Sequence, residues 1–105
     1  MKPNLDEALK HAIATLSKGK PKEAESLYRE VLQIEPNHLA ANHNLAVLLQ
    51  NIGKLEEAES SYKKVIKLKP DFAEAYYNLA VTLKSLGELD EAEACYKKTI
   101  DLKPE

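Results

Sequence analysis

Glycine, alanine, tyrosine and proline recur along this chain at a common spacing of 34 residues, as in the step from Gly19 to Gly53. A period of this length, shared by several residue types, is the signature of an internal repeat. One repeat cannot bury its own apolar face, so repeats stack on their neighbours and create an extended surface. The period therefore favours a binding scaffold over an enzyme. The recurring positions are Gly19, Gly53 and Gly87; Ala24, Ala58 and Ala92; Tyr28, Tyr62 and Tyr96; and Pro36, Pro70 and Pro104.

Each repeat has the pattern of two helices. In the middle repeat, apolar residues at helical spacing occupy 41–52, and Gly53 favours a helix end because glycine accepts the left-handed conformation. A second apolar stripe occupies 55–68, and Pro70 disfavours helix in the residue before it. The pattern predicts an all-α chain of six antiparallel helices, near residues 6–18, 21–34, 38–52, 55–68, 72–86 and 89–102.

The charges of the second helices support this assignment. Acidic residues precede basic ones in each of the last two, an order that suits the helix dipole. Glu59–Lys63 and Glu93–Lys97 are favourable pairs one helical turn apart, each contributing a few tenths of a kcal/mol.

Composition excludes several classes of function. The chain has 105 residues and a formal net charge of -2, and no basic stripe predicts a nucleic-acid partner. No apolar stretch approaches the length that spans a membrane, and no apolar signal-peptide core follows the polar start. The single cysteine, Cys95, permits no intrachain disulfide and fits a reducing compartment, so we expect a cytoplasmic location.

The residues that usually carry chemistry are not arranged for it. His38 and His43 are separated by about 140° around a helix, so with His11 they do not predict a metal site. Cys95 has no activating base in the repeat pattern, and the glycines are helix ends rather than a phosphate-binding loop. We expect no catalytic residue, no cofactor and no metal.

The repeated positions also identify a family. The chain resembles a run of three tetratricopeptide repeats, which have small residues at two helix-packing positions, an aromatic in the second helix and a closing proline. The resemblance implies one domain over residues 1–105, with repeats at 5–38, 39–72 and 73–105, folded as an α-solenoid with a right-handed superhelix. The first small position is Ala12, Ala46 and Ala80, and the other positions are those given above.

The first and last helices depart from this pattern. Leu9, Ala12, Ile13 and Leu16 lie at helical spacing, which suggests that the first helix is rotated relative to its counterparts. At the other end no additional helix follows, so Leu89, Ala92, Tyr96 and Ile100 are expected to leave one side of the last helix partly exposed. Such an end favours either a fragment of a longer protein or a homo-oligomer that packs end to end.

In this family the first helices of successive repeats line a concave groove, which implies a set of peptide-binding residues in this chain. Asn44 and Asn78 occupy the position that forms an asparagine ladder in O-GlcNAc transferase repeats, and a side-chain amide can both donate to and accept from a peptide bond. Val47, Val81 and Ile13 are expected to be partly buried on the groove floor. The implied groove residues are Asn44, Asn78, His43, Tyr77, Val47, Val81, Gln50, Lys84 and Asn51.

The family's clamp for acidic chaperone tails does not match this sequence. Its basic positions fall on Leu9, Glu74 and Asn78, and its asparagines fall on Ile13 and Asn44, so one position alone agrees. Three hypotheses remain open at this point: a non-enzymatic scaffold that binds an extended peptide or a partner's helix, a fragment of a larger transferase that positions its protein substrate, and a self-assembling structural module.

Overall fold

The fold was obtained as a computed structural model, which describes residues 4–104. All of the regular structure in this range is helical, so the predicted all-α class is confirmed. The predicted helix ends agree with the observed ones to within one residue. The helices are α1 Leu5–Ser17, α2 Pro21–Ile34, α3 Leu39–Asn51, α4 Leu55–Leu68, α5 Ala73–Ser85 and α6 Leu89–Leu102.

The two helices of each repeat are joined by a tight turn at a glycine. Gly53 has a φ of 85°, in the left-handed region that a side chain disfavours, and Gly19 and Gly87 share this conformation. At the start of α3 the side chain of His38 accepts a hydrogen bond from the Ala41 amide at 3.1 Å. Asn42 donates to the carbonyl oxygens of Pro36 and His38, which fixes the connection from α2.

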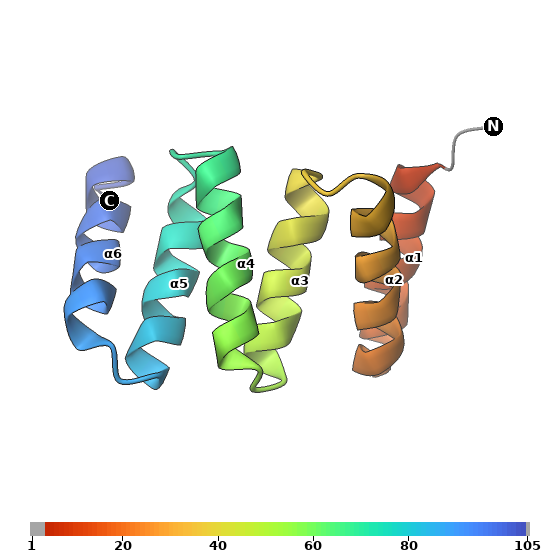
Figure 1. Ribbon diagram of the computed structural model, residues 1–105, viewed down its shortest axis with the longest axis horizontal. Coiled ribbons are helices and arrows are strands. Elements are labelled where there is room, and N and C mark those ends of the chain that lie inside the picture. Colours follow the sequence, from red (N-terminus) through yellow and green to blue (C-terminus); the bar gives the residue numbers. More distant parts are fainter. Residues whose placement is uncertain (1–3, 105) are drawn as a thin grey trace.

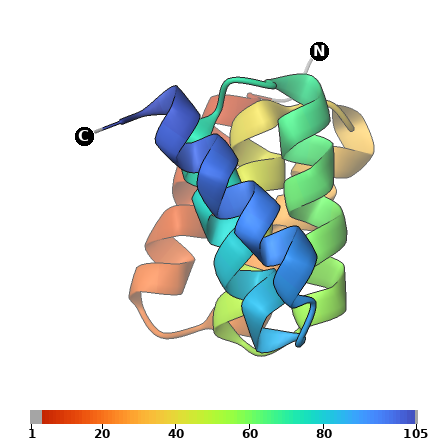
Figure 2. The ribbon, with the colours of Figure 1, turned by 90° about the vertical axis from the view of Figure 1, so that its left-hand side faces the viewer.

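The three helix pairs follow one another along a stack that is 44 Å long and about half as wide, with the chain ends at opposite ends (Figure 1). Figure 2 views the stack from its C-terminal end, where α6 lies in front of α5. The two helices of each repeat pack together, and neighbouring repeats are joined by α2 against α3 and by α4 against α5. Helix α3 also contacts α5. Among the residues that the structure describes, the second helices make no comparable contact with one another.

Small and aromatic residues build the core between these helices. The three alanines at the first small position, Ala12, Ala46 and Ala80, are fully buried and let the helices approach closely. Tyr28 and Tyr62, from the second helices of the first two repeats, are also buried. The 34-residue period therefore reflects one packing interface repeated along the stack.

One expectation about the terminal helices is wrong, and the other fails at Ala92 alone. Helix α1 is not rotated: Ala12 and Thr15 are buried, like their counterparts in α3 and α5, and Ile13 is 44% exposed. The buried alanine sets the register of the helix, and the additional apolar residues remain on its flanks. At the other end Ala92 is only 3% exposed, because it packs into the core of its own repeat, whereas Leu89 and Ile100 are exposed as expected.

Ion pairs connect the second helices across the repeat boundaries. Both predicted pairs within a helix are confirmed, with N–O distances of 2.7 Å for Lys63–Glu59 and 3.1 Å for Lys97–Glu93. Lys63 also reaches Glu91 of the next repeat at 3.1 Å. The carboxylate of Glu59, followed by that of Glu91, raises the pKa of Lys63 to about 12. Arg29 makes the equivalent contacts one repeat earlier, with Glu25 and Glu57.

Candidate peptide-binding groove

The first helices expose a pocket of about 340 Å³ where α1, α3 and α5 come together. Ile13 and Leu16 of α1 and Val47 of α3 give it apolar walls, and Tyr28 contributes from α2. His43 and Asn44 of α3 and Glu74 of α5 supply the polar groups. The pocket lies on the side of the first helices, where the family resemblance places the groove. Of the predicted groove residues, it brings together His43, Asn44 and Val47.

His43 is buried at the junction of two repeats. Its ring lies 4.8 Å from the ring of Phe72 and 6.1 Å from that of Tyr62, between centroids, and the side chain is 9% exposed. Its Nε2 atom has no hydrogen-bond partner among residues 4–104. Burial lowers the pKa of His43 below its ordinary value, and the Glu74 carboxylate opposes part of that shift. The imidazole is therefore neutral at pH 7.

The hydroxyl of Tyr28 lacks the hydrogen-bond acceptor that its counterpart in the next repeat, Tyr62, has. The hydroxyl of Tyr62 donates to Oε1 of Gln50 at 2.6 Å. One repeat earlier, Leu16 stands at the position of Gln50 and cannot accept, so the hydroxyl of Tyr28 has no such partner. Burial raises the pKa of Tyr28, which keeps the hydroxyl protonated. This side of the pocket thus combines an apolar wall with a hydroxyl that lacks the repeat's usual acceptor.

The other predicted groove residues lie outside this pocket. On α5, Asn78 is half-buried. Its main-chain carbonyl oxygen accepts a hydrogen bond from the Thr82 hydroxyl, and this contact does not use the side-chain amide. Tyr77 is 51% exposed and packs edge-on against Tyr96, with 6.0 Å between ring centroids. Val47 and Val81 are half-buried, as expected, whereas the expectation is wrong for Ile13, which is 44% exposed. Gln50 is engaged by Tyr62, and Asn51 and Lys84 are exposed at the ends of their helices.

A second hollow, which the sequence did not suggest, lies between the C-terminal half of α4 and the loop before α3. It encloses about 660 Å³ beside α4. Nothing in the sequence singled out the three lysines of this hollow, because charged residues on a helix are usually exposed to solvent. Its walls are Asn37, Lys63, Lys64, Lys67 and Leu68.

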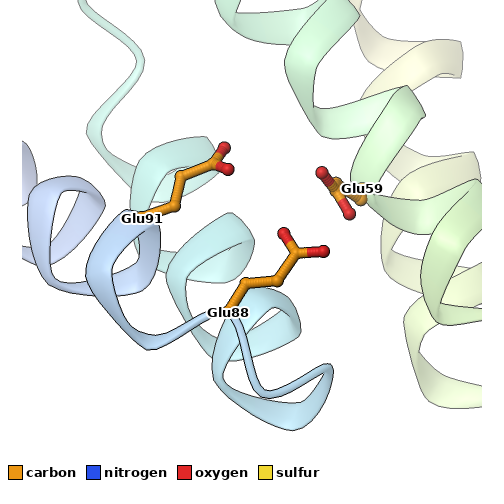
Figure 3. A group of neighbouring side chains, drawn as sticks. All are labelled: Glu59, Glu88 and Glu91. Atoms are coloured by element: carbon orange, nitrogen blue, oxygen red, sulfur yellow. The ribbon is translucent and has the colours of Figure 1, made fainter.

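A group of three carboxylates stands where α4 meets the start of α6. Oxygens of Glu59, Glu88 and Glu91 lie within 4.8 Å of one another (Figure 3). Lys63 forms ion pairs with Glu59 and Glu91, which supplies positive charge to this group. Elsewhere, burial raises the pKa of the Cys95 thiol, so it remains protonated rather than becoming a nucleophile. No helix within residues 4–104 is both long and apolar enough to cross a bilayer.

Comparison with known proteins identifies the family. Family models described as tetratricopeptide or TPR repeat match residues 15–61, 51–87 and 73–105. Together these matches span residues 15–105, and they agree with the observed pairs of helices. The chain therefore consists of tetratricopeptide repeats. A search of curated proteins finds no match to the chain.

Solved structures share the whole arrangement. A crystal structure of MamA has 28% sequence identity and a TM-score of 0.90, over 96% of this chain and 59% of that chain. YrrB, described as a TPR protein with an unusual peptide-binding site, has 26% identity and a TM-score of 0.89, over 99% of this chain and 54% of that chain. The second TPR of Spaghetti (RPAP3), bound to the HSP90 peptide SRMEEVD, has 21% identity and a TM-score of 0.88, over 94% and 92%. The chain spans less than two thirds of MamA and YrrB.

Proposed function

We propose that this chain is a non-enzymatic protein-interaction module that holds an extended peptide in the groove formed by its first helices. The observation that carries the proposal is the pocket between α1, α3 and α5, which has apolar walls and the amide of Asn44 at its edge. The similarity to YrrB, whose description names a peptide-binding site, supports the same reading. The pocket contains no pair of carboxylates or activated nucleophile of the kind that catalysis requires.

Asn44 and Asn78 are the residues we assign to the peptide backbone. They occupy equivalent positions on α3 and α5, and each is half-buried, so part of the amide remains accessible. Packed helices lie about 8–10 Å apart, and an extended peptide rises about 3.3–3.6 Å per residue. Successive amides would then meet roughly every third residue of the ligand. Specificity would come from neighbouring side chains, because amide contacts to a backbone do not depend on sequence.

A chaperone tail of the SRMEEVD kind does not fit this groove. Such a peptide carries several carboxylates, whereas Glu74 is exposed beside the pocket and Leu9 replaces a basic position of the family's clamp. The likeness to the RPAP3 domain therefore supports the fold and not the ligand.

Removal of both amides tests the proposal. Asn44→Ala combined with Asn78→Ala should weaken binding of a randomised extended-peptide pool, measured by fluorescence anisotropy, by about tenfold or more. Gln33→Ala, which removes an exposed amide from α2, is the matched control and should bind like the unmodified chain. Helical circular dichroism and the melting temperature should not fall in either variant. Undiminished affinity in the double variant, with the fold intact, would refute the assignment.

A second candidate is end-to-end self-association, favoured by the exposure of Leu89 and Ile100 on α6, at 62% and 61%. Full burial of one such side chain is worth about 1.5–3 kcal/mol. Light scattering over a concentration series tests it, because a constant monomer mass excludes assembly. If the chain belongs to a larger transferase, as the second hypothesis from the sequence states, the sequence after Glu105 in the gene will encode that domain.

A further inference from the structure

The pocket between α1, α3 and α5 is more specific than a backbone-binding groove requires. Its volume of about 340 Å³ is at the lower end of ligand pockets and is large enough to admit a long side chain. We propose that it binds a basic side chain, lysine or arginine, from a peptide that lies along the groove. This inference rests on the proposed function and names the residue that the peptide must carry.

The pocket walls suit the stem of such a side chain. Ile13 is 44% exposed, and Leu16 and Val47 are half-buried, so all three keep apolar surface toward an occupant. Lysine and arginine carry three or four methylene groups that pack on apolar surface while the charged end reaches polar groups. An occupant without a long stem would leave these walls exposed to water.

The polar groups around the pocket suit the charged end. Among the described residues that line it, Glu74 alone carries a formal charge at neutral pH, and no ion pair to its carboxylate is found within residues 4–104. One further group that lines the pocket lacks a partner in that range: His43 is nine-tenths buried with Nε2 unpaired. The hydroxyl of Tyr28 lacks the amide acceptor of its counterpart Tyr62, because Leu16 stands at the position of Gln50.

These polar groups distinguish a basic occupant from the alternatives. A buried polar atom without a partner, such as Nε2 of His43, costs about 1–3 kcal/mol, and a neutral imidazole can accept a hydrogen bond. An ammonium or guanidinium group supplies several donors and the opposite charge to Glu74. An acidic side chain would be repelled by that carboxylate, and an aliphatic one would leave Nε2 of His43 unpaired and Glu74 without an opposite charge.

Peptide pools that differ at one position provide the test. Each pool has randomised flanks around a fixed lysine, arginine, norleucine or glutamate, and binding to the whole chain is measured by anisotropy at low salt. Norleucine keeps the stem of lysine and lacks its ammonium group. The lysine and arginine pools should bind about threefold to tenfold more tightly than the norleucine pool. The glutamate pool should bind most weakly.

Glu74→Gln should remove most of this preference, because it deletes the charge and keeps the shape. Glu30→Gln removes an equal charge from an exposed site on α2 and should leave the preference unchanged. His43→Phe retains an aromatic ring against Phe72 and should also reduce the preference for a basic residue. Equal affinity for the norleucine and lysine pools, or a preference that survives Glu74→Gln, would overturn the inference.

Failure of this inference is separable from failure of the proposed function. If binding depends on Asn44 and Asn78 but has the same affinity for every fixed residue, the peptide-groove proposal holds and the basic-pocket inference fails. If no pool binds, the peptide-groove proposal fails, and N-acetyl-lysine methylamide tests the pocket alone. In nuclear magnetic resonance spectra, this amide should shift the His43 ring signals more than the norleucine amide does, and equal shifts would reject the basic pocket.

Discussion

The two boundaries between repeats differ at one charged position, and this difference predicts a stabilising substitution. At the first boundary, Nζ of Lys54 lies 3.3 Å from a carboxylate oxygen of Glu25. Burial acts to raise the pKa of Glu25, but hydrogen bonds from Arg29 and Lys54 outweigh it and hold the pKa below its usual value. At the second boundary, the residue equivalent to Lys54 is Glu88, which instead adds a third carboxylate to the group in Figure 3.

The substitution Glu88→Lys should convert the second boundary into the first. Carboxylate oxygens about 4.8 Å apart repel by about 0.9 kcal/mol in bulk water, and physiological salt reduces this to about 0.5 kcal/mol. Glu88 takes part in two such contacts, with Glu59 and Glu91, and an exposed ion pair adds about 0.2–1 kcal/mol. A cation at the start of α6 costs about 0.3–1 kcal/mol against the helix dipole. These figures leave a net gain of about 0.2–1.7 kcal/mol, centred near 1 kcal/mol.

Thermal and urea unfolding, followed by circular dichroism, measure this gain. For a domain of this size it corresponds to a rise of about 2–6 °C in the melting temperature. Lys54→Glu is the matched reverse change and should lower stability by a similar amount. Both effects should shrink in about 1 M salt, where the screening length falls to about 3 Å. A loss of stability in Glu88→Lys, or a gain in Lys54→Glu, would refute this account of the boundary.

Three further predictions follow from buried groups and turns. The free energy of unfolding should keep its full value above about pH 6.5 and fall below that pH. The reason is that burial lowers the pKa of His43, so the unfolded chain takes up the proton first. His43→Phe should reduce this loss in urea titrations between about pH 7 and pH 5.5. Tyr62→Phe should cost about 0.5–1.5 kcal/mol through its lost bond to Gln50, and Tyr28→Phe less than half of that in the same assay. Gly53→Ala should cost about 1–2 kcal/mol by thermal melting, since its φ is 85° although nothing within 4 Å blocks a methyl group; a loss below about 0.5 kcal/mol would contradict this.

The fold could be predicted from the sequence because the residues that set the helix ends and the helix packing recur three times. The glycine and proline positions set the helix ends to within one residue, and the alanines identified the closest packing positions. The register of α1 was predicted incorrectly because the additional apolar residues of that helix mimic a shifted stripe. A single buried residue, Ala12, outweighs them because only a small side chain fits between packed helices.

The candidate site was harder to predict because its members come from different repeats and from both helix types. The family resemblance named His43, Asn44 and Val47 separately, and the pocket that joins them depends on how α1 and α5 pack against α3. The sequence identified Tyr28 only as the repeated aromatic of the second helix, although it also lines the pocket. A comparison of equivalent positions could have revealed it, since Leu16 replaces the partner that a repeated tyrosine would need.

The positions at which the repeats differ indicate most about function, because the identical positions are already explained by packing. Leu16, Gln50 and Lys84 occupy one equivalent position on α1, α3 and α5. The amide of Gln50 closes a hydrogen bond within its own repeat, while the apolar side chain of Leu16 leaves Tyr28 beside an open pocket. Replacing Leu16 by glutamine would restore the bond of the second repeat and occupy the pocket with a side chain of the protein itself. That variant should bind basic peptides more weakly and should lose less stability than Leu16→Ala in the same melting assay, because the new hydrogen bond offsets part of the lost packing of Leu16 on the core.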